Sequence, residues 1–190
     1  MPSPTDKDRF DRAIARIDDA NQADPNTIAV DGRPQPKELA HARMLTDWIR
    51  RLRPHASEPL LLAARAHHIR RWSSPRSSYP KGRRAYLDWR RNLHQFHAQE
   101  VGRILQDVGY DADTIARVQQ IVRKERLRAD PEVQALEDGL CLVFLQTQID
   151  DLTDSLEDQD KMVSVLRKTW RKMSPAGRDA ALQLDLSERA

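Results

Sequence analysis

Apolar residues recur at helical spacing in most of the chain. Near the N-terminus they predict a helix from residue 5 to about residue 21, capped by Thr5, with an apolar stripe at Phe10, Ala13, Ile14 and Ile17. The same pattern predicts further helices over residues 37–52, 60–71, 83–108, 111–125, 131–152 and 161–173. Ser174-Pro175 is typical of the start of a last short helix.

Two polar segments interrupt this periodicity. Residues 23–36 contain an Asp-Gly pair and several prolines, and residues 72–82 are rich in serine and proline, so we expect both to be loops. No segment has the alternation expected of a strand hairpin. The sequence therefore predicts a single all-α domain over residues 1–190, with helices at about 158–185 as a C-terminal extension.

Composition narrows this picture. Apolar residues make up 39% of the chain and aromatic residues only 5%, so the core must be largely aliphatic. The net charge of +3 is too small to indicate nucleic-acid binding by itself. The single cysteine, Cys141, excludes an internal disulfide. The N-terminus shows no signal sequence, and no apolar run approaches the roughly 20 residues of a membrane helix, so we expect a cytoplasmic protein that does not contact a membrane.

The most informative segment is an apolar run that ends in adjacent imidazoles, Leu60-Leu-Leu-Ala-Ala-Arg-Ala-His67-His68-Ile69. A buried imidazole needs partners for both ring nitrogens, and metal coordination is one way to supply them. His41 on the preceding helix and Asp138 on a later one also lie in apolar stripes, where an isolated polar group is costly. These four residues are therefore candidate metal ligands.

The order of these residues resembles the HD-domain metallohydrolase superfamily. Its members place a histidine on one helix, a His-Asp pair at the end of the next and an aspartate on a later helix. The segment from His97 to Gly109 and the segment Leu136-Glu-Asp138-Gly-Leu-Cys-Leu are similar to two further superfamily segments. The resemblance implies an HD-domain-like helical bundle with a core at about residues 37–152.

The same resemblance implies a metal site. The expected ligands are His41, His67, His68 and Asp138, with His97 as an auxiliary ligand or substrate contact. His68 stands where the superfamily has an aspartate that helps to position the attacking water, so His68 and Asp138 are the expected catalytic residues. Glu137 should point elsewhere on its helix. A nitrogen-rich site with one carboxylate favours a divalent transition metal such as manganese, iron, nickel or zinc.

A second resemblance covers nearly the whole chain. The segments Ala64-Arg-Ala-His-His-Ile-Arg-Arg-Trp72, residues 136–145 and Lys168-Thr-Trp-Arg-Lys-Met-Ser174 look like the family called domain of unknown function 4202. This resemblance implies a compact helical protein and brings no reaction with it.

Residues 70–91 form a basic segment with interleaved aromatic residues. Arginine pairs bidentately with phosphate, and aromatic faces can stack on a base. The candidate phosphate-binding residues are Arg70, Arg71, Arg76, Arg83 and Arg84, with Lys168 or Lys172 on a later helix as a further candidate. The alternative is a solvated basic loop followed by an amphipathic helix.

Three functions remain open from the sequence. The first is a metal-dependent phosphohydrolase acting on a phosphorylated small molecule, which we expect to be a nucleotide. The second is a non-catalytic helical module that binds RNA or a protein partner through residues 70–91. The third is an HD-type iron oxygenase. There is no glycine-rich phosphate loop and no G-x-S-x-G motif, so serine-based catalysis has no support.

Overall fold

The computed structural model describes residues 6–147 and 159–184, and its architecture is mostly helical. Its first half contains α1 (Asp6–Gln22), β1 (Thr27–Val30), β2 (Arg33–Pro36), α2 (Lys37–Leu52) and α3 (Glu58–Ala66). Two 3-10 helices, Arg71–Ser73 and Arg76–Ser78, precede α4 (Arg83–Val108). The second half contains α5 (Ala112–Val122), α6 (Pro131–Thr147), α8 (Gln159–Lys172) and α9 (Pro175–Ala181).

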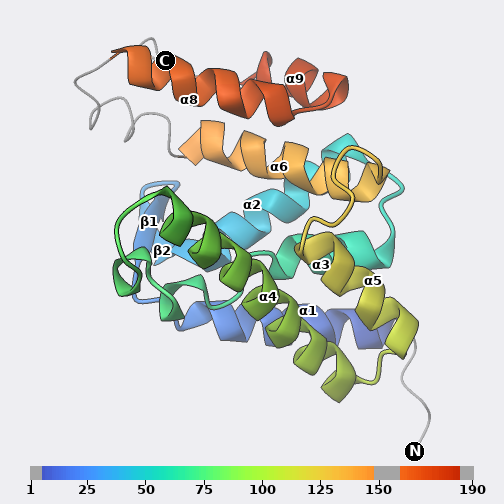
Figure 1. Ribbon diagram of the computed structural model, residues 1–190. Coiled ribbons are helices and arrows are strands. Elements are labelled where there is room, and N and C mark those ends of the chain that lie inside the picture. Colours follow the sequence, from blue (N-terminus) through green and yellow to red (C-terminus); the bar gives the residue numbers. More distant parts are fainter. Residues whose placement is uncertain (1–5, 148–158, 185–190) are drawn as a thin grey trace, which may run out of the picture.

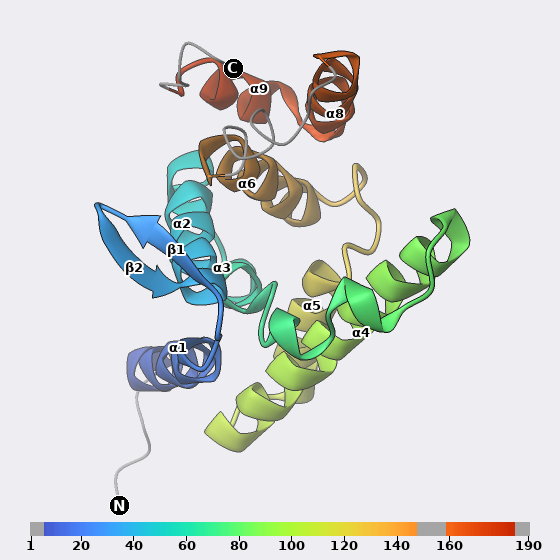
Figure 2. The ribbon, with the colours of Figure 1, turned by 90° about the vertical axis from the view of Figure 1, so that its left-hand side faces the viewer.

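Helix α3 lies at the centre of the bundle and packs against α1, α2, α5 and α6. Its side chains at Leu62, Ala63, Ala64 and Ala66 are fully buried, which explains why this helix is apolar almost all round. Helices α1 and α4 pack together on one side, whereas α8 and α9 lie against α6 on the opposite side (Figures 1 and 2). The aliphatic core joins these layers through Ile17, Ile49, Leu62, Val101, Ile121 and Leu142.

Most helix boundaries confirm the sequence prediction. Helix α2 spans residues 37–52 as expected, and α4 ends at residue 108. Ser174 caps α9, because its hydroxyl accepts a hydrogen bond from the Gly177 N–H. The predicted cap at Thr5 and the predicted end of the helix near residue 152 lie outside the described residues.

The expected loop at residues 23–36 is wrong, because β1 and β2 form an antiparallel hairpin there. The two residues between the strands, Asp31 and Gly32, both have positive φ angles, of 50° and 73°. Two such residues make the tight turn that suits the right-handed twist of paired strands. The hairpin packs against α2, so it stays at the edge of the helical bundle (Figure 2).

Helix α3 ends earlier than predicted, and this places the histidine pair in a turn. The helix stops at Ala66, and Arg70 adopts a left-handed conformation with φ of 51°. The Asn21 side-chain oxygen accepts a hydrogen bond of 3.0 Å from the Arg70 N–H, which fixes this turn against α1. His67 and His68 therefore lie on a tightly held turn at the centre of the molecule, and not on a regular helix.

No helix in the described ranges 6–147 and 159–184 is long and apolar enough to cross a membrane.

Candidate functional site: a cationic pocket lined by histidines

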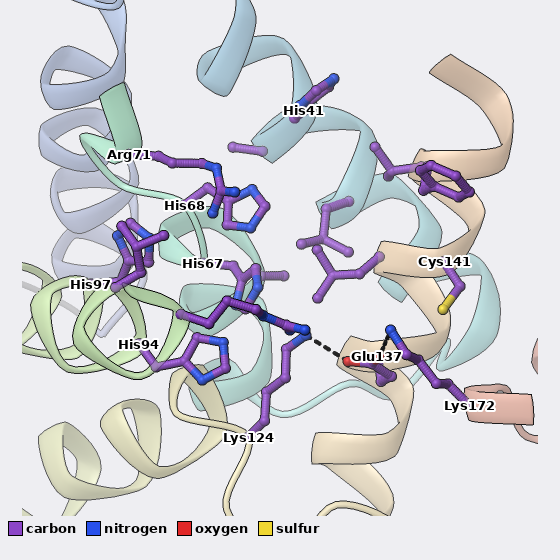
Figure 3. Close-up of a pocket in the computed structure, with 18 of the residues that line it drawn as sticks. His41, His67, His68, Arg71, His94, His97, Lys124, Glu137, Cys141 and Lys172 are labelled. Carbon is purple, nitrogen blue, oxygen red and sulfur yellow. Dashed lines mark hydrogen bonds and ion pairs between the residues drawn. The ribbon is translucent and has the colours of Figure 1, made fainter. Parts of the chain in front are cut away.

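A cavity of about 410 Å³ lies between α2, the turn after α3, α4, α6 and α8 (Figure 3). Apolar side chains from α2, α6 and α8 form part of its wall. Among the described residues, the polar lining consists of five histidines, four cationic side chains and one carboxylate, together with Tyr86, Trp89, Cys141 and Thr169. The size falls within the range of small-molecule sites, which bind their ligands in concave pockets with a few converging polar groups.

Five of the six histidines in the chain line this cavity. They are His41 from α2, His67 and His68 from the turn after α3, and His94 and His97 from α4. The ring centroids of His67 and His68 lie 4.5 Å apart, those of His67 and His94 lie 6.4 Å apart, and those of His68 and His97 lie 5.9 Å apart. The structure thus brings together all the histidines that the sequence singled out, with His94 in addition.

These imidazoles are held in their neutral form. Burial lowers the pKa of His97 to about 3 and that of His94 to about 4, and it lowers the pKa values of His41, His67 and His68 as well. The neighbouring histidines and the cations Lys124 and Arg71 act in the same direction. A neutral imidazole can accept a proton, but the lowered pKa values make these rings weak bases at neutral pH unless a bound anion raises them again.

Two imidazole nitrogens of the described residues are fully buried and lack a hydrogen-bond partner. His97 Nδ1 lies 2.8 Å from the Ile69 carbonyl oxygen, and because a carbonyl can only accept, this nitrogen carries the proton. His97 Nε2 is then a buried acceptor without a partner, and His67 Nδ1 is also buried and unpaired. Unsatisfied buried polar atoms are rare in folded proteins and are a feature of binding sites.

The Glu38 carboxylate lies close to three of the lining residues, and it was not among the predicted site residues. Its carboxylate Oε2 lies 3.3 Å from His68 Nδ1 and 4.0 Å from His41 Nδ1, and its Oε1 lies 3.8 Å from Arg71 Nε. Burial raises the pKa of Glu38, and His41 and Arg71 oppose that rise. The signal in the sequence was its position three residues before His41, on the same face of a helix.

Asp138 does not reach the histidines. Its carboxylate accepts hydrogen bonds from the Ser174 N–H (2.8 Å), the Ser174 hydroxyl (2.6 Å) and the Gln134 side-chain amide (3.0 Å). Asp138 does not line the cavity. In this structure its role is to fix the start of α9 against α6, which differs from the expected role as a metal ligand.

The neighbouring carboxylate, Glu137, lies in the cavity instead. It forms an ion pair of 2.5 Å with Lys124 Nζ and a longer one of 3.7 Å with Lys172 Nζ (Figure 3). Burial alone raises the pKa of Glu137, but the two lysines outweigh it and hold that pKa below its usual range. The expectation that Glu137 points elsewhere is therefore wrong, because α6 turns it and not Asp138 toward the histidines.

Two arginines reach the cavity with their guanidinium groups against aromatic rings. The guanidinium carbon of Arg71 lies 5.1 Å from the ring centre of Trp89, and that of Arg90 lies 6.0 Å from the ring centre of Tyr86. The Trp89 indole N–H donates a hydrogen bond of 2.9 Å to the Ser74 carbonyl, which fixes that ring. The aromatic residues of the basic segment thus position arginines as well as lining the pocket.

The other predicted phosphate-binding residues do not line this cavity. Arg70 pairs with Glu100 at 3.1 Å, and Arg76 donates hydrogen bonds to the carbonyls of Tyr79 and Pro80. The remaining three side chains are exposed to solvent, namely Arg83, Arg84 and Lys168. Of the predicted set, Arg71 and the alternative Lys172 reach the cavity. Arg90 and Lys124 also line it, although neither was predicted to bind phosphate.

The described residues do not fit a preformed metal centre. Within residues 6–147 and 159–184, no group of three or more histidine, cysteine, aspartate or glutamate side chains is arranged to hold a metal ion. The adjacent histidines lie close to one another, but the carboxylate expected to join them, Asp138, bonds to Ser174. Metal binding therefore remains a prediction from sequence.

The comparisons with known proteins give one match. The family described as domain of unknown function (DUF4202) matches residues 11–190, which is nearly the whole chain. No curated protein and no solved structure matches the chain.

Proposed function

The chain belongs to the family described as domain of unknown function (DUF4202), a description that names no reaction, and from its pocket we propose a phosphohydrolase acting on a phosphorylated small molecule. A nucleotide is the ligand class that we propose first. The proposal keeps the HD-like core at about residues 37–152, which is supported by the order of His41 and the His67-His68 pair along the chain.

One observation carries this proposal, namely the charge of the cavity wall. Arg71, Arg90, Lys124 and Lys172 come from four different parts of the chain and line the same cavity. Among the described residues, Glu137 is the only carboxylate in the lining, and Glu38 lies behind it beside Arg71. Because like charges repel, four cations around one cavity destabilise the fold, and a bound anion would offset that repulsion. A phosphate group carries up to two negative charges and several acceptor oxygens, which suits this surplus of cations.

The two arginines are suited to bind the phosphate by its oxygens. A guanidinium group presents its N–H donors as a planar fork that can bond two phosphate oxygens at once. Trp89 and Tyr86 lie beside Arg71 and Arg90, which limits the orientations of the two forks. A prearranged cation stabilises the charge of a phosphoryl group without reorganising during the reaction.

His68 is the proposed proton acceptor. Glu38 lies beside its Nδ1 and favours the tautomer with the proton on that nitrogen, so Nε2 is left to accept a proton. In the proposed hydrolysis, water attacks phosphorus, the bond from phosphorus to the ester oxygen breaks, and His68 takes the proton that the water loses. The leaving oxygen, on the opposite side of phosphorus, takes a proton from solvent, and the imidazolium releases its proton to solvent.

Measuring phosphate release from a panel of phosphorylated metabolites tests the proposal. The protein is purified without a histidine tag and assayed with and without added manganese, iron, nickel or zinc, which also tests the metal prediction. We expect release from at least one compound class, and an Arg90→Gln variant should lower kcat/KM by on the order of tenfold, because a charged hydrogen bond is lost.

Arg91→Gln is the matched control for this assay. Arg91 is the next residue of α4, is exposed and pairs with Asp88 at 2.6 Å, so its loss should leave phosphate release unchanged. If no compound is hydrolysed under any metal condition, the proposed function is wrong. If both variants lose activity equally, the proposed role of Arg90 is wrong.

A second candidate is the binding of RNA through the start of α4. The observation that favours it is the exposure of Lys81, Arg83 and Arg84, which lie outside the cavity. Such basic side chains can contact a nucleic-acid backbone. This alternative predicts that reversing the charges of Arg83 and Arg84 abolishes retention on RNA, whereas Arg90→Gln leaves it unchanged in a filter-binding assay.

A further inference from the structure

The connection between α5 and α6 is strained at three basic residues. Lys124, Arg126 and Arg128 have φ angles of +57°, +59° and +75°, in the left-handed region that favours glycine. In an L-residue this conformation brings Cβ close to the following carbonyl oxygen. Strain of this kind persists where the surrounding structure maintains it, and it is concentrated at functional sites.

Lys124 occupies the position that closes the C-terminus of α5. Its N–H donates a hydrogen bond to the Ile121 carbonyl (2.9 Å), and the Glu125 N–H donates to the Gln120 carbonyl (3.1 Å). This pair of bonds is the common C-terminal motif of helices, in which the left-handed residue is usually glycine. Here that residue is a lysine, although glycine would adopt the same conformation without strain.

Only Lys124 among these three residues turns its side chain into the cavity. Its side chain is 12% exposed and pairs with Glu137, whereas Arg126 and Arg128 are exposed and do not line the cavity. Burial lowers the pKa of Lys124, and Glu137 partly offsets that change. The strained backbone therefore delivers a buried ammonium group to the cavity.

Glu137 neutralises only part of the charge that it contacts. It is one carboxylate between two ammonium groups, at 2.5 Å from Lys124 and 3.7 Å from Lys172. Its side chain is 6% exposed, and Lys172 is 45% exposed, so one of the two cations can be reached from solvent. A phosphoryl group is also an anion with acceptor oxygens, so it could pair with the same two ammonium groups in place of the Glu137 carboxylate.

We propose that Lys124 and Lys172 form the binding site of the ligand's phosphoryl group, and that the Glu137 carboxylate occupies this site until the ligand displaces it. The proposal rests on the proposed function and adds two lysines to the two arginines that would bind the anion in that pocket. It also gives a reason for a lysine at a position where glycine would be less strained. The alternative is an ion pair that only ties α6 to the preceding loop.

Titrating the protein with inorganic phosphate in a calorimeter distinguishes these two roles. Glu137→Gln removes the competing charge and keeps the shape, so phosphate should bind on the order of tenfold more tightly than it binds to the wild type. Adding Lys124→Gly to this variant should abolish the gain. The double variant should nevertheless melt at the same temperature as Glu137→Gln or higher, because glycine relieves the backbone strain.

Arg126→Gly is the matched control, since it relieves a similar strain two residues away without removing a cation from the cavity. It should raise the melting temperature and leave phosphate binding at the wild-type value. The proposal is overturned if Glu137→Gln binds phosphate no more tightly than the wild type, if Lys124→Gly leaves the gain in place, or if Arg126→Gly weakens binding as much as Lys124→Gly does.

These outcomes are separable from failure of the proposed function. If phosphate release depends on Arg90 but phosphate binding is unaffected by Glu137→Gln and Lys124→Gly, the proposed function stands and the proposed binding site at the two lysines is wrong. If no compound is hydrolysed while the Glu137→Gln variant gains phosphate binding that Lys124→Gly removes, the binding site at the two lysines exists and the proposed hydrolysis is wrong.

Discussion

At the scale of single residues, the pocket concentrates side chains whose protonation is shifted by burial. His97 is the clearest case, because it is 1% exposed and its pKa is lowered to about 3. The Ile69 carbonyl accepts a hydrogen bond from the Nδ1–H group of His97, so the neutral ring is both buried and oriented. In an unfolded chain the same imidazole titrates near pH 6.5. This difference links the protonation of His97 to the stability of the fold.

We predict that the protein loses stability as the pH falls below about 6.5. Above that pH, His97 is neutral in both states, and its contribution is fully present. Between about 6.5 and about 3 the unfolded chain binds a proton that folded His97 does not, so the free energy of unfolding falls by up to about 1.4 kcal/mol per pH unit for this residue. Urea unfolding at pH 7 and pH 5 measures the loss.

His97→Asn provides the comparison for this prediction. Asparagine keeps an N–H donor for the Ile69 carbonyl and does not titrate, so the variant should be less sensitive to acid than the wild type. Equal losses between pH 7 and pH 5 in both proteins would show that His97 does not carry this dependence.

At the scale of elements, the hairpin of β1 and β2 is the part of the fold that the periodicity missed. Its strands have four residues each, and β2 contains Pro34 and Pro36, which cannot donate hydrogen bonds to a partner strand. The turn at Asp31-Gly32 was visible in the sequence, but neither flanking segment alternates between apolar and polar residues, because β1 ends in three consecutive apolar residues and β2 contains none besides its two prolines. The turn residues therefore decide this element, since its apolar pattern is weak.

Gly32→Ala should lower the free energy of unfolding by about 1 kcal/mol. Gly32 has a φ of +73°, and a Cβ added there would meet no atom within 4 Å, so the loss comes from the backbone alone. Gly32→Asn should cost less, because asparagine tolerates this conformation better than alanine does. Chemical denaturation of the three proteins checks the order, and an alanine variant as stable as the wild type would contradict it.

At the scale of the whole molecule, the pocket exists because the C-terminal helices dock on α6. Val165, Thr169 and Lys172 from α8 line the cavity opposite the histidines of α2–α4. The docking depends on a close approach between α9 and α6, where a Cβ added to Gly177 would lie 2.7 Å from the Asp138 carboxylate carbon. Asp138 is held by Gln134 and Ser174, so it cannot move aside easily.

We predict that Gly177→Ala and Asp138→Ala each destabilise the protein by about 1–3 kcal/mol, the first through overlap and the second through lost hydrogen bonds. In the double variant the overlap is gone, so the combined loss should be smaller than the sum of the two single losses. Thermal or urea unfolding of the four proteins measures this coupling. Additive losses would mean that the two residues act independently.

The sequence by itself determined the helices of this protein and the chemistry of its central turn. Helix periodicity and capping are local properties, so residues 37–52 and the cap at Ser174 could be predicted without a fold. The histidine pair after an apolar run likewise indicated a buried polar site, and the cavity lies there. The match over residues 11–190 confirms the resemblance to the family described as domain of unknown function (DUF4202).

Only the tertiary structure decided which charged residues face the histidines. Helix α6 is buried on nearly all sides, so its apolar pattern does not define an inward face, and the choice between Glu137 and Asp138 depended on how α8 and α9 pack. Lys124 and Arg90 lie far from the histidine pair in sequence, and they converge with Arg71 and Lys172 only after folding. Ligand-binding charge is therefore a property of the assembled pocket, because it depends on contacts between distant segments that no local pattern records.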